Sequence, residues 1–133
     1  MAVTRSNIEI VFAGWLDAIR RGDVALMEQT LAPEVVHRGI RPDLACNGRQ
    51  EVLDMQRGRR LPDVEALELV AAGDKVVMSV RSPQVGVGLE DDAPPRGQAC
   101  VVFTLAGGKI MSMQDYLRRA DALAAAGATA DWA

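Results

Sequence analysis

The clearest chemical group in this chain is a carboxylate that lies among apolar residues. In the β-like run Lys109–Arg118, strand alternation puts Met111, Met113, Asp115 and Leu117 on one face. A carboxylate with three apolar neighbours is either a shielded functional acid or a surface residue whose strand assignment is wrong. Asp115 is therefore a candidate general acid or base.

The second chemical group is His37, the one histidine of the chain. It lies in a short β-like run, Glu34–Arg38, and shares a face with Val35. Next to a carboxylate, a histidine can act as a general base near neutral pH, because the carboxylate orients the ring. A strand histidine whose ring bonds a loop carbonyl fits the sequence about as well.

The overall composition argues against several functional classes. The net charge is −3, so a nucleic-acid surface is not expected. Cys46 and Cys100 fit no metal or redox spacing, and one histidine cannot build a metal cluster. We therefore expect no metal and no cofactor. The first residues contain no apolar run and no stretch reaches membrane-spanning length, so we expect no secretory signal, no membrane contact and a cytoplasmic protein.

Apolar spacing and turn residues predict the elements that must position these groups. Ser6 and Asp23 are expected helix N-caps, Gly22 a helix stop, and Pro33 the end of the second helix. The expected helices are Asn7–Arg21, Val24–Leu31, Arg49–Arg57 and Arg118–Ala126. The expected strands are Glu34–Arg38, Val64–Ala71, Lys75–Ser82 and the hairpin of Gly97–Leu105 with Lys109–Arg118, whereas Gly39–Asn47 and Pro83–Arg96 are expected loops.

This order of elements predicts the fold class. Helices gather near the start and antiparallel strands follow, which is typical of an α+β domain. We expect one domain over residues 1–133, with flexible ends at 1–5 and 127–133. A curved sheet wrapped over the first helix would leave a concave apolar pocket between them.

Short motifs spread over nearly the whole chain resemble the SnoaL-like branch of the nuclear-transport-factor-2-like (NTF2-like) fold. They are Phe12-Ala-Gly-Trp-Leu, Arg21-Gly-Asp, Leu31-Ala-Pro-Glu-Val, Gly48-Arg-Gln-Glu-Val, Gly73-Asp, Phe103-Thr-Leu, Gly108-Lys-Ile and Asp115-Tyr. The resemblance implies a cone of helices on a strongly curved mixed or antiparallel sheet that encloses a pocket. This fold carries isomerases, cyclases, dehydratases, epoxide hydrolases and binding modules, so it does not settle function.

Steroid isomerases of this fold use a tyrosine, a base aspartate and a protonated aspartate. The matching positions hold Trp15, Gly39 and Val101, so the resemblance does not extend to that activity. Limonene-type epoxide hydrolases use Arg-x-Asp, a last-strand aspartate and Tyr-x-Asn. Arg81 and Asp115 match that set, whereas Pro83 and Gly39 replace two of its residues and His37 replaces its tyrosine.

What the resemblance leaves is a catalytic trio of His37, Arg81 and Asp115. It implies that all three face one pocket, where Arg81 would bind or polarise a substrate oxyanion. An ion pair of Asp115 with Arg81 that only holds the sheet is the structural alternative. The residues expected to contact an apolar substrate are Trp15, Met55, Ala99, Val101, Phe103, Met113 and Leu117.

Three functions therefore stay open at this point. The first is a cofactor-independent isomerase, cyclase, dehydratase or epoxide hydrolase acting on a small apolar molecule. The second is a binding module for such a ligand, and the third is a dimerisation domain with a salt-bridged core. We expect a homodimer through an open sheet face that includes Cys100, Val102 and Tyr116, on the side away from the pocket.

Overall fold

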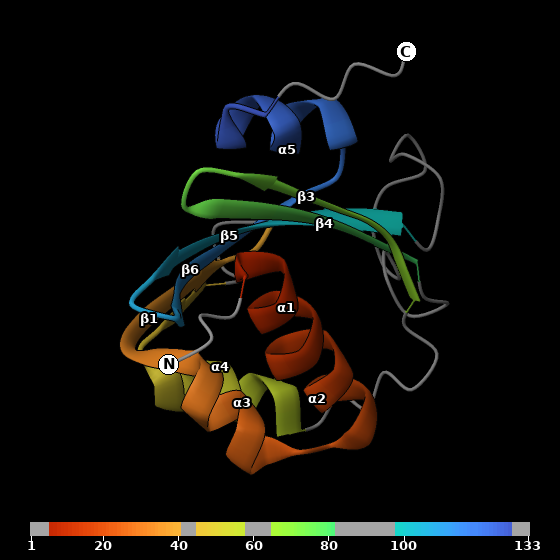
Figure 1. Cartoon of the computed structure of the whole chain (residues 1–133). Coiled ribbons are helices and arrows are strands. Elements are labelled where there is room, and N and C mark those ends of the chain that lie inside the picture. The colour runs from red at the N-terminus through yellow and green to blue at the C-terminus, as the bar shows by residue number, and fades with distance from the viewer. Residues whose placement is uncertain (1–5, 41–44, 58–64, 82–97, 129–133) are drawn as a thin grey trace.

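The chain folds into one six-stranded sheet with helices on both faces (Figure 1). The structure, a computed structural model, describes residues 6–40, 45–57, 65–81 and 98–128. The helical segments are α1 (Asn7–Val11), the π-helical η1 (Phe12–Leu16), α2 (Asp17–Arg21), α3 (Val24–Thr30), α4 (Arg49–Arg57) and α5 (Arg119–Ala126). The strands are β1 (Leu31–Arg38), β2 (Ala45–Asn47), β3 (Glu65–Ala72), β4 (Lys75–Arg81), β5 (Gln98–Ala106) and β6 (Lys109–Tyr116).

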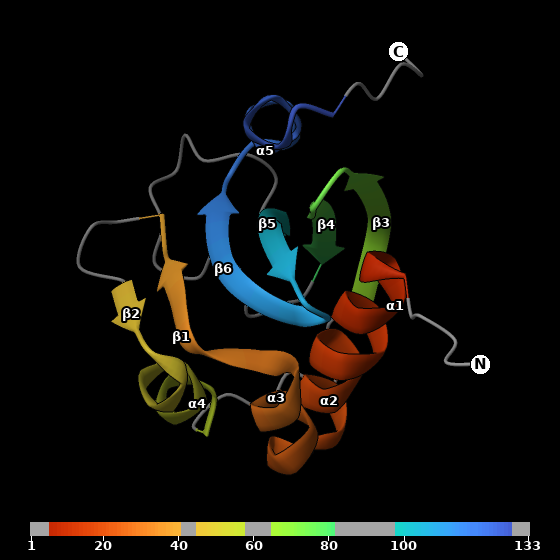
Figure 2. The same cartoon turned by 60° about the vertical axis from the view of Figure 1, so that its left-hand side comes forward.

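The sheet is mixed, with strand order β2-β1-β6-β5-β4-β3. Strands β1 and β6 run parallel, and the other neighbouring pairs are antiparallel. Figure 2 shows the strands along an arc that opens toward α1 and α2. The α+β class predicted from the sequence is confirmed. The predicted loop Pro83–Arg96 and the segment 129–133 lie outside the described residues.

The first helical segment follows its sequence signals. The Ser6 hydroxyl accepts a hydrogen bond from the Glu9 backbone N–H at 3.2 Å, and Gly22 ends the segment with a φ of 68°. Asp23 then caps α3 by accepting from the Leu26 N–H at 3.1 Å. The middle of the expected helix is π-helical, which the apolar spacing did not predict.

Two expectations about the next segment are wrong. Strand β1 starts at Leu31, directly after α3, so Pro33 lies inside a strand and does not end the helix. The β1–β6 register shifts between Leu31 and Val36, and a proline is tolerated at such an irregularity because a ladder hydrogen bond is already missing there. Residues Ala45–Asn47, expected in a loop, form β2 at the sheet edge and pair with β1.

The predicted hairpin of β5 and β6 is confirmed, with one difference. Gly107 and Gly108 make the turn with φ values of 59° and 78°, a region that glycine enters without strain. The pairing then passes from Thr104–Ser112 to Leu105–Ile110, which leaves Met111 as an extra residue. The bulge puts the fully buried Ile110 into the core beside Met113, so the prediction that Met111 shares that face is wrong.

Apolar clusters lie on both faces of the sheet. The larger one fills the space between the concave face and α1–α4, and it includes Trp15, Phe103 and Met113. The smaller one, which we call the α5 cluster, consists of Val77, Cys100, Val102, Ala122, Leu123 and Ala126. Because α5 buries Cys100 and Val102, the expectation of an open sheet face at these residues is wrong. Dimerisation itself stays a prediction.

Candidate functional site

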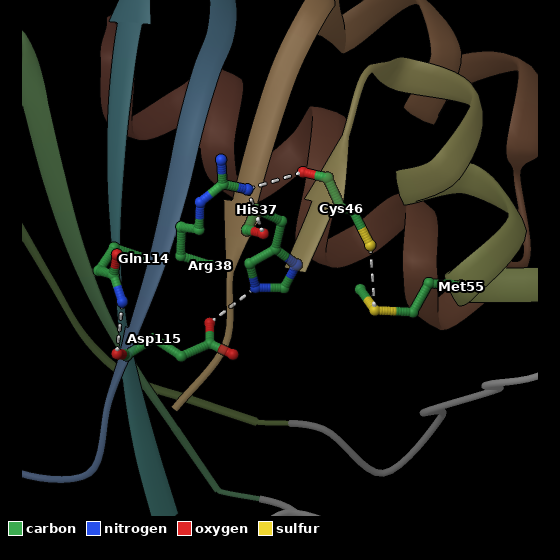
Figure 3. A network of polar contacts seen from close by, with 6 residues as sticks. All are labelled: His37, Arg38, Cys46, Met55, Gln114 and Asp115. Carbon is green, nitrogen blue, oxygen red and sulfur yellow. Dashed lines mark hydrogen bonds and ion pairs between the residues drawn. The ribbon is translucent and has the colours of Figure 1, made fainter. Parts of the chain in front are cut away.

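The parallel pairing of β1 with β6 brings His37 and Asp115 together. His37 lies opposite Met113 in the β1–β6 register, and Asp115 follows two residues later on the same face of β6. The His37 Nε2 atom is 2.9 Å from Asp115 Oδ1. Figure 3 shows the two side chains pointing toward each other from β1 and β6. This contact joins residues 78 positions apart and unites two of the three predicted catalytic groups.

The burial of the His37 ring indicates which of its two nitrogens carries the hydrogen when the imidazole is neutral. The Nδ1 atom of His37 has less than 1 Å² of accessible surface, and no described residue hydrogen bonds to it. A hydrogen on Nδ1 would be a buried donor without an acceptor, which is costly. The hydrogen therefore belongs on Nε2, which donates it to the Asp115 carboxylate, and Nδ1 keeps a lone pair.

Asp115 is the more accessible member of the pair. Its side chain is 26 % exposed, against 13 % for His37. In the part of the chain that the structure describes, His37 is the one side chain that bonds the Asp115 carboxylate. Oxygen Oδ2 is therefore the atom of the pair best placed to meet a small molecule.

Arg81, the third predicted catalytic residue, ends β4, and its backbone pairs with Glu65 and Gln98. Its side chain lies outside what the structure describes. Along β4 the residue alternates with Val80, which belongs to the concave cluster, so strand register groups Arg81 with Ser79. A role for Arg81 beside His37 and Asp115 therefore stays a prediction.

The residues predicted to contact an apolar substrate differ in how deeply they are buried. Trp15 is 4 % exposed, whereas Phe103 and Met113 are 0 % and 1 % exposed, so these three are core residues. Val101 lies directly opposite Asp115 in the β5–β6 register and is partly buried. Met55 and Leu117 are also partly buried, and the Ala99 side chain lies outside the described part. Accessible apolar surface thus comes from Met55, Val101 and Leu117, and the pocket itself stays a prediction.

Sequence reasoning missed Cys46 as a neighbour of His37, and it expected Met55 only as an apolar substrate contact. Cys46 on β2 is the direct register partner of His37, and its thiol donates to the Met55 thioether with an Sγ–Sδ distance of 3.7 Å (Figure 3). Arg38 holds β2 in place by donating to the Cys46 carbonyl at 3.3 Å and to Asn47 Oδ1 at 2.9 Å. A three-residue strand has too little alternation to be read from sequence, so Cys46 seemed to lie in a loop.

An ion pair on the other face has a different character. Arg119 of α5 donates to both carboxylate oxygens of Glu68 on β3, at 2.7 and 2.8 Å. This bidentate bond holds the pKa of Glu68 below its ordinary value of 4.5, against an opposing effect of burial, and raises the pKa of Arg119. Nearby, Ser79 Oγ and Cys100 Sγ lie 3.1 Å apart. Cys100 thus faces away from His37, as predicted.

The comparison with protein families is decisive. Residues 12–113 match the model of the SnoaL-like domain. The chain belongs to the SnoaL-like domain family. His37 lies inside the range matched by the SnoaL-like domain model, whereas Asp115 lies two residues after the end of that range. No curated protein matches the chain.

Solved structures agree with this family. An NTF2-like protein of unknown function from Cytophaga hutchinsonii superposes with a TM-score of 0.66 at 13% identity, over 87% of this chain and 93% of that one. A protein with a ketosteroid isomerase-like fold from Catenulispora acidiphila, in complex with trimethylamine, gives 0.63 at 20% identity, over 96% and 99%. A proposed SnoaL-like polyketide cyclase from Jannaschia sp. CCS1 gives 0.60 at 23% identity, over 94% and 96%. At these identities the likeness shows the NTF2-like fold alone, which confirms the predicted resemblance.

Two other kinds of feature are absent from the described residues. Among the described His, Cys, Asp and Glu side chains, no three gather as a group that could hold a metal ion. None of the helices in the described ranges is long and apolar enough to cross a bilayer.

Proposed function

We propose that this SnoaL-like domain is a cofactor-independent enzyme that moves a proton on a small apolar carbonyl compound. The observation that carries the proposal is the 2.9 Å bond between His37 and Asp115. A carboxylate that has only apolar neighbours is free to rotate and is poorly oriented for catalysis. The hydrogen bond from His37 Nε2–H restricts the orientation of the Asp115 carboxylate. Asp115 is the catalytic base in this proposal, and His37 is a positioning residue.

The exposures of the two side chains support this division of roles. The His37 Nδ1 lone pair is buried, so a substrate cannot reach it without displacing protein atoms. The Asp115 carboxylate has exposed surface, and Val101 lies opposite it with an apolar side chain. From the sequence, Asp115 was a candidate acid or base and His37 a candidate base. Accessibility favours the carboxylate instead.

The proposed step balances without an outside reactant. Asp115 Oδ2 takes a proton from the carbon next to the substrate carbonyl, the C–H electron pair forms the C=C bond, and the carbonyl oxygen becomes an enolate. If the ketone is β,γ-unsaturated, the resulting dienolate takes the proton from Asp115 at its γ-carbon, which gives isomerisation. Alternatively, the enolate carbon attacks a second carbonyl, whose oxygen takes that proton, which gives cyclisation. A cation or hydrogen-bond donor beside the carbonyl would stabilise the enolate oxygen. The ketosteroid isomerase-like and cyclase names of the structural neighbours support this class.

Hydrogen exchange from carbon tests the proposal without knowledge of the natural substrate. The protein is incubated in D₂O with bicyclic aryl ketones such as α-tetralone, and loss of the α-proton signal is followed by NMR. We expect exchange above the buffer rate, and we expect Asp115→Asn to abolish it. Asp121→Asn, on exposed surface of α5, is the matched control. Equal exchange by wild type and Asp115→Asn would rule out this role for Asp115.

A dimerisation module is the second candidate function. The observation in its favour is the nearly complete burial of Trp15, Phe103 and Met113. Side chains without accessible surface are in contact with protein on every side, so little room is left among them for a ligand. If no ketone of the panel exchanges, and the sedimentation coefficient is that of a dimer, this second function is favoured.

A further inference from the structure

Behind the proposed base, three donor atoms of soft or intermediate character come from neighbouring elements. Cys46 and His37 are directly opposed across the antiparallel β1–β2 pair, which puts their side chains on one face with Cβ atoms about 5 Å apart. Met55 of α4 contacts the Cys46 thiol. Figure 3 shows the unbonded ring nitrogen of His37 on the side of Cys46 and Met55, opposite the nitrogen that bonds Asp115.

The sulfur–sulfur distance fits two ligands of one metal ion. Sulfur ligands lie about 2.3 Å from a bound metal, so two of them are about 3.7 Å apart at a tetrahedral angle and about 4.0 Å apart at a trigonal one. The Cys46 Sγ and Met55 Sδ atoms are 3.7 Å apart. An ion between them would need no large movement of either side chain.

His37 has the environment that a histidine ligand requires. A metal-bound imidazole nearly always donates its other N–H to a carboxylate, which fixes the ring and the tautomer. Here Nε2 bonds Asp115, and the lone pair of Nδ1 is buried and takes no hydrogen bond from the described residues. Val52 and Leu53 of α4 belong to the same buried apolar cluster as Cys46.

We propose that Cys46, Met55 and His37 Nδ1 form a binding site for one cuprous ion, Cu(I). Thiolate and thioether ligands favour Cu(I), whereas Zn²⁺ usually takes four ligands in structural sites. Binding replaces the thiol proton: the S–H bond breaks, an S–Cu bond forms, one proton leaves to solvent, and no electron is transferred. The site shares His37 with the proposed acid–base pair but uses the other ring nitrogen, so Nε2–H still holds Asp115 and copper binding does not depend on the acid–base chemistry.

Competition for Cu(I) tests the site. The reduced protein is titrated anaerobically into the Cu(I) complex of bicinchoninate, and loss of the chelator's colour reports transfer of copper to the protein. We expect one equivalent to bind. Cys46→Ser should weaken binding at least about 100-fold, and Met55→Leu and His37→Gln about tenfold each or more, since each removes one ligand.

Two matched variants separate this site from adventitious thiol binding. Cys100→Ser removes the buried thiol of the α5 cluster, and Met113→Leu removes a buried thioether near His37, so both should bind as wild type. Binding that is lost in Cys100→Ser, or that is unchanged in both Met55→Leu and His37→Gln, overturns the proposal. Circular dichroism shows whether each variant is folded. The readout is copper binding, so it is independent of the ketone exchange test.

Discussion

Two carboxylate pairs, Glu68 with Arg119 and Asp115 with His37, lie on opposite faces of one sheet and differ in how completely they are bonded. On the α5 face, both oxygens of Glu68 accept hydrogen bonds from Arg119. On the concave face, one oxygen of Asp115 accepts one bond from His37, and the far nitrogen of the ring is bonded by no described residue. A pair with all its bonds made inside the chain fixes structure. A pair that keeps atoms without a hydrogen bond inside the protein can bind or react with another molecule.

The largest expected effect is the loss of activity in Asp115→Asn. The amide keeps the size of the side chain and can still bond His37, but it cannot accept a proton from carbon. We expect ketone exchange to fall about 100- to 10,000-fold, or about 3 to 5 kcal/mol of barrier. We expect little change in Tm by calorimetry. A large loss of Tm would instead give Asp115 the structural role that the comparison assigns to Glu68.

The next effect concerns the α5 cluster. Leu123 is 7 % exposed, and its truncation in Leu123→Ala leaves a cavity under α5. We expect about 2 to 4 kcal/mol less stability in urea unfolding. Ketone exchange should be kept under folding conditions, because α5 is on the far face from Asp115. The exposed Ala124→Ser variant on the same helix is the control. Loss of exchange in folded Leu123→Ala would mean that the two faces are coupled.

A positioning residue should matter less than a base. In His37→Gln the amide can still donate to Asp115, but the ring plane is lost. We expect exchange to fall about tenfold, through kcat more than KM, because the variant alters the orientation of the base and leaves the apolar contacts intact. A fall as large as that in Asp115→Asn would make His37 the base itself and would reverse the two roles.

The smallest effect is the pH dependence carried by Glu68. Its pKa is lowered in the folded chain by the Arg119 hydrogen bonds, so its contribution to stability is complete above its ordinary value of 4.5. That contribution is lost as the pH falls through the folded pKa. We expect Glu68→Gln to lower Tm by a few degrees at pH 7 and by less in acid, measured by calorimetry. Glu28→Gln, on exposed surface of α3, should show no such trend.

Local signals predicted the helices and hairpins well, because caps and turns are set by neighbouring residues. Ser6, Gly22, Asp23 and the Gly107–Gly108 turn all act where the sequence places them. The alternation of side chains along the strand gave the wrong face for Met111, because a β-bulge adds one residue that the sequence pattern does not predict.

The site was harder to predict than the fold. The meeting of His37 with Asp115 depends on parallel pairing between strands far apart in the chain, and only the family resemblance suggested it. Cys46 was missed because β2 has three residues. The sequence did not predict that α5 packs over Cys100, because the alanine-rich sequence of α5 does not indicate which face of the helix packs on the sheet.

The parallel seam between β1 and β6 has a consequence for how the molecule forms. The pairs β3–β4, β4–β5 and β5–β6 join strands that follow one another in the chain, so this meander can assemble by local steps. The seam instead closes a loop of more than seventy residues, which is slow because contacts of high sequence separation reduce folding rates. We expect the His37–Asp115 contact to appear only when the two halves of the chain dock, so a partly folded chain would lack the acid–base pair altogether.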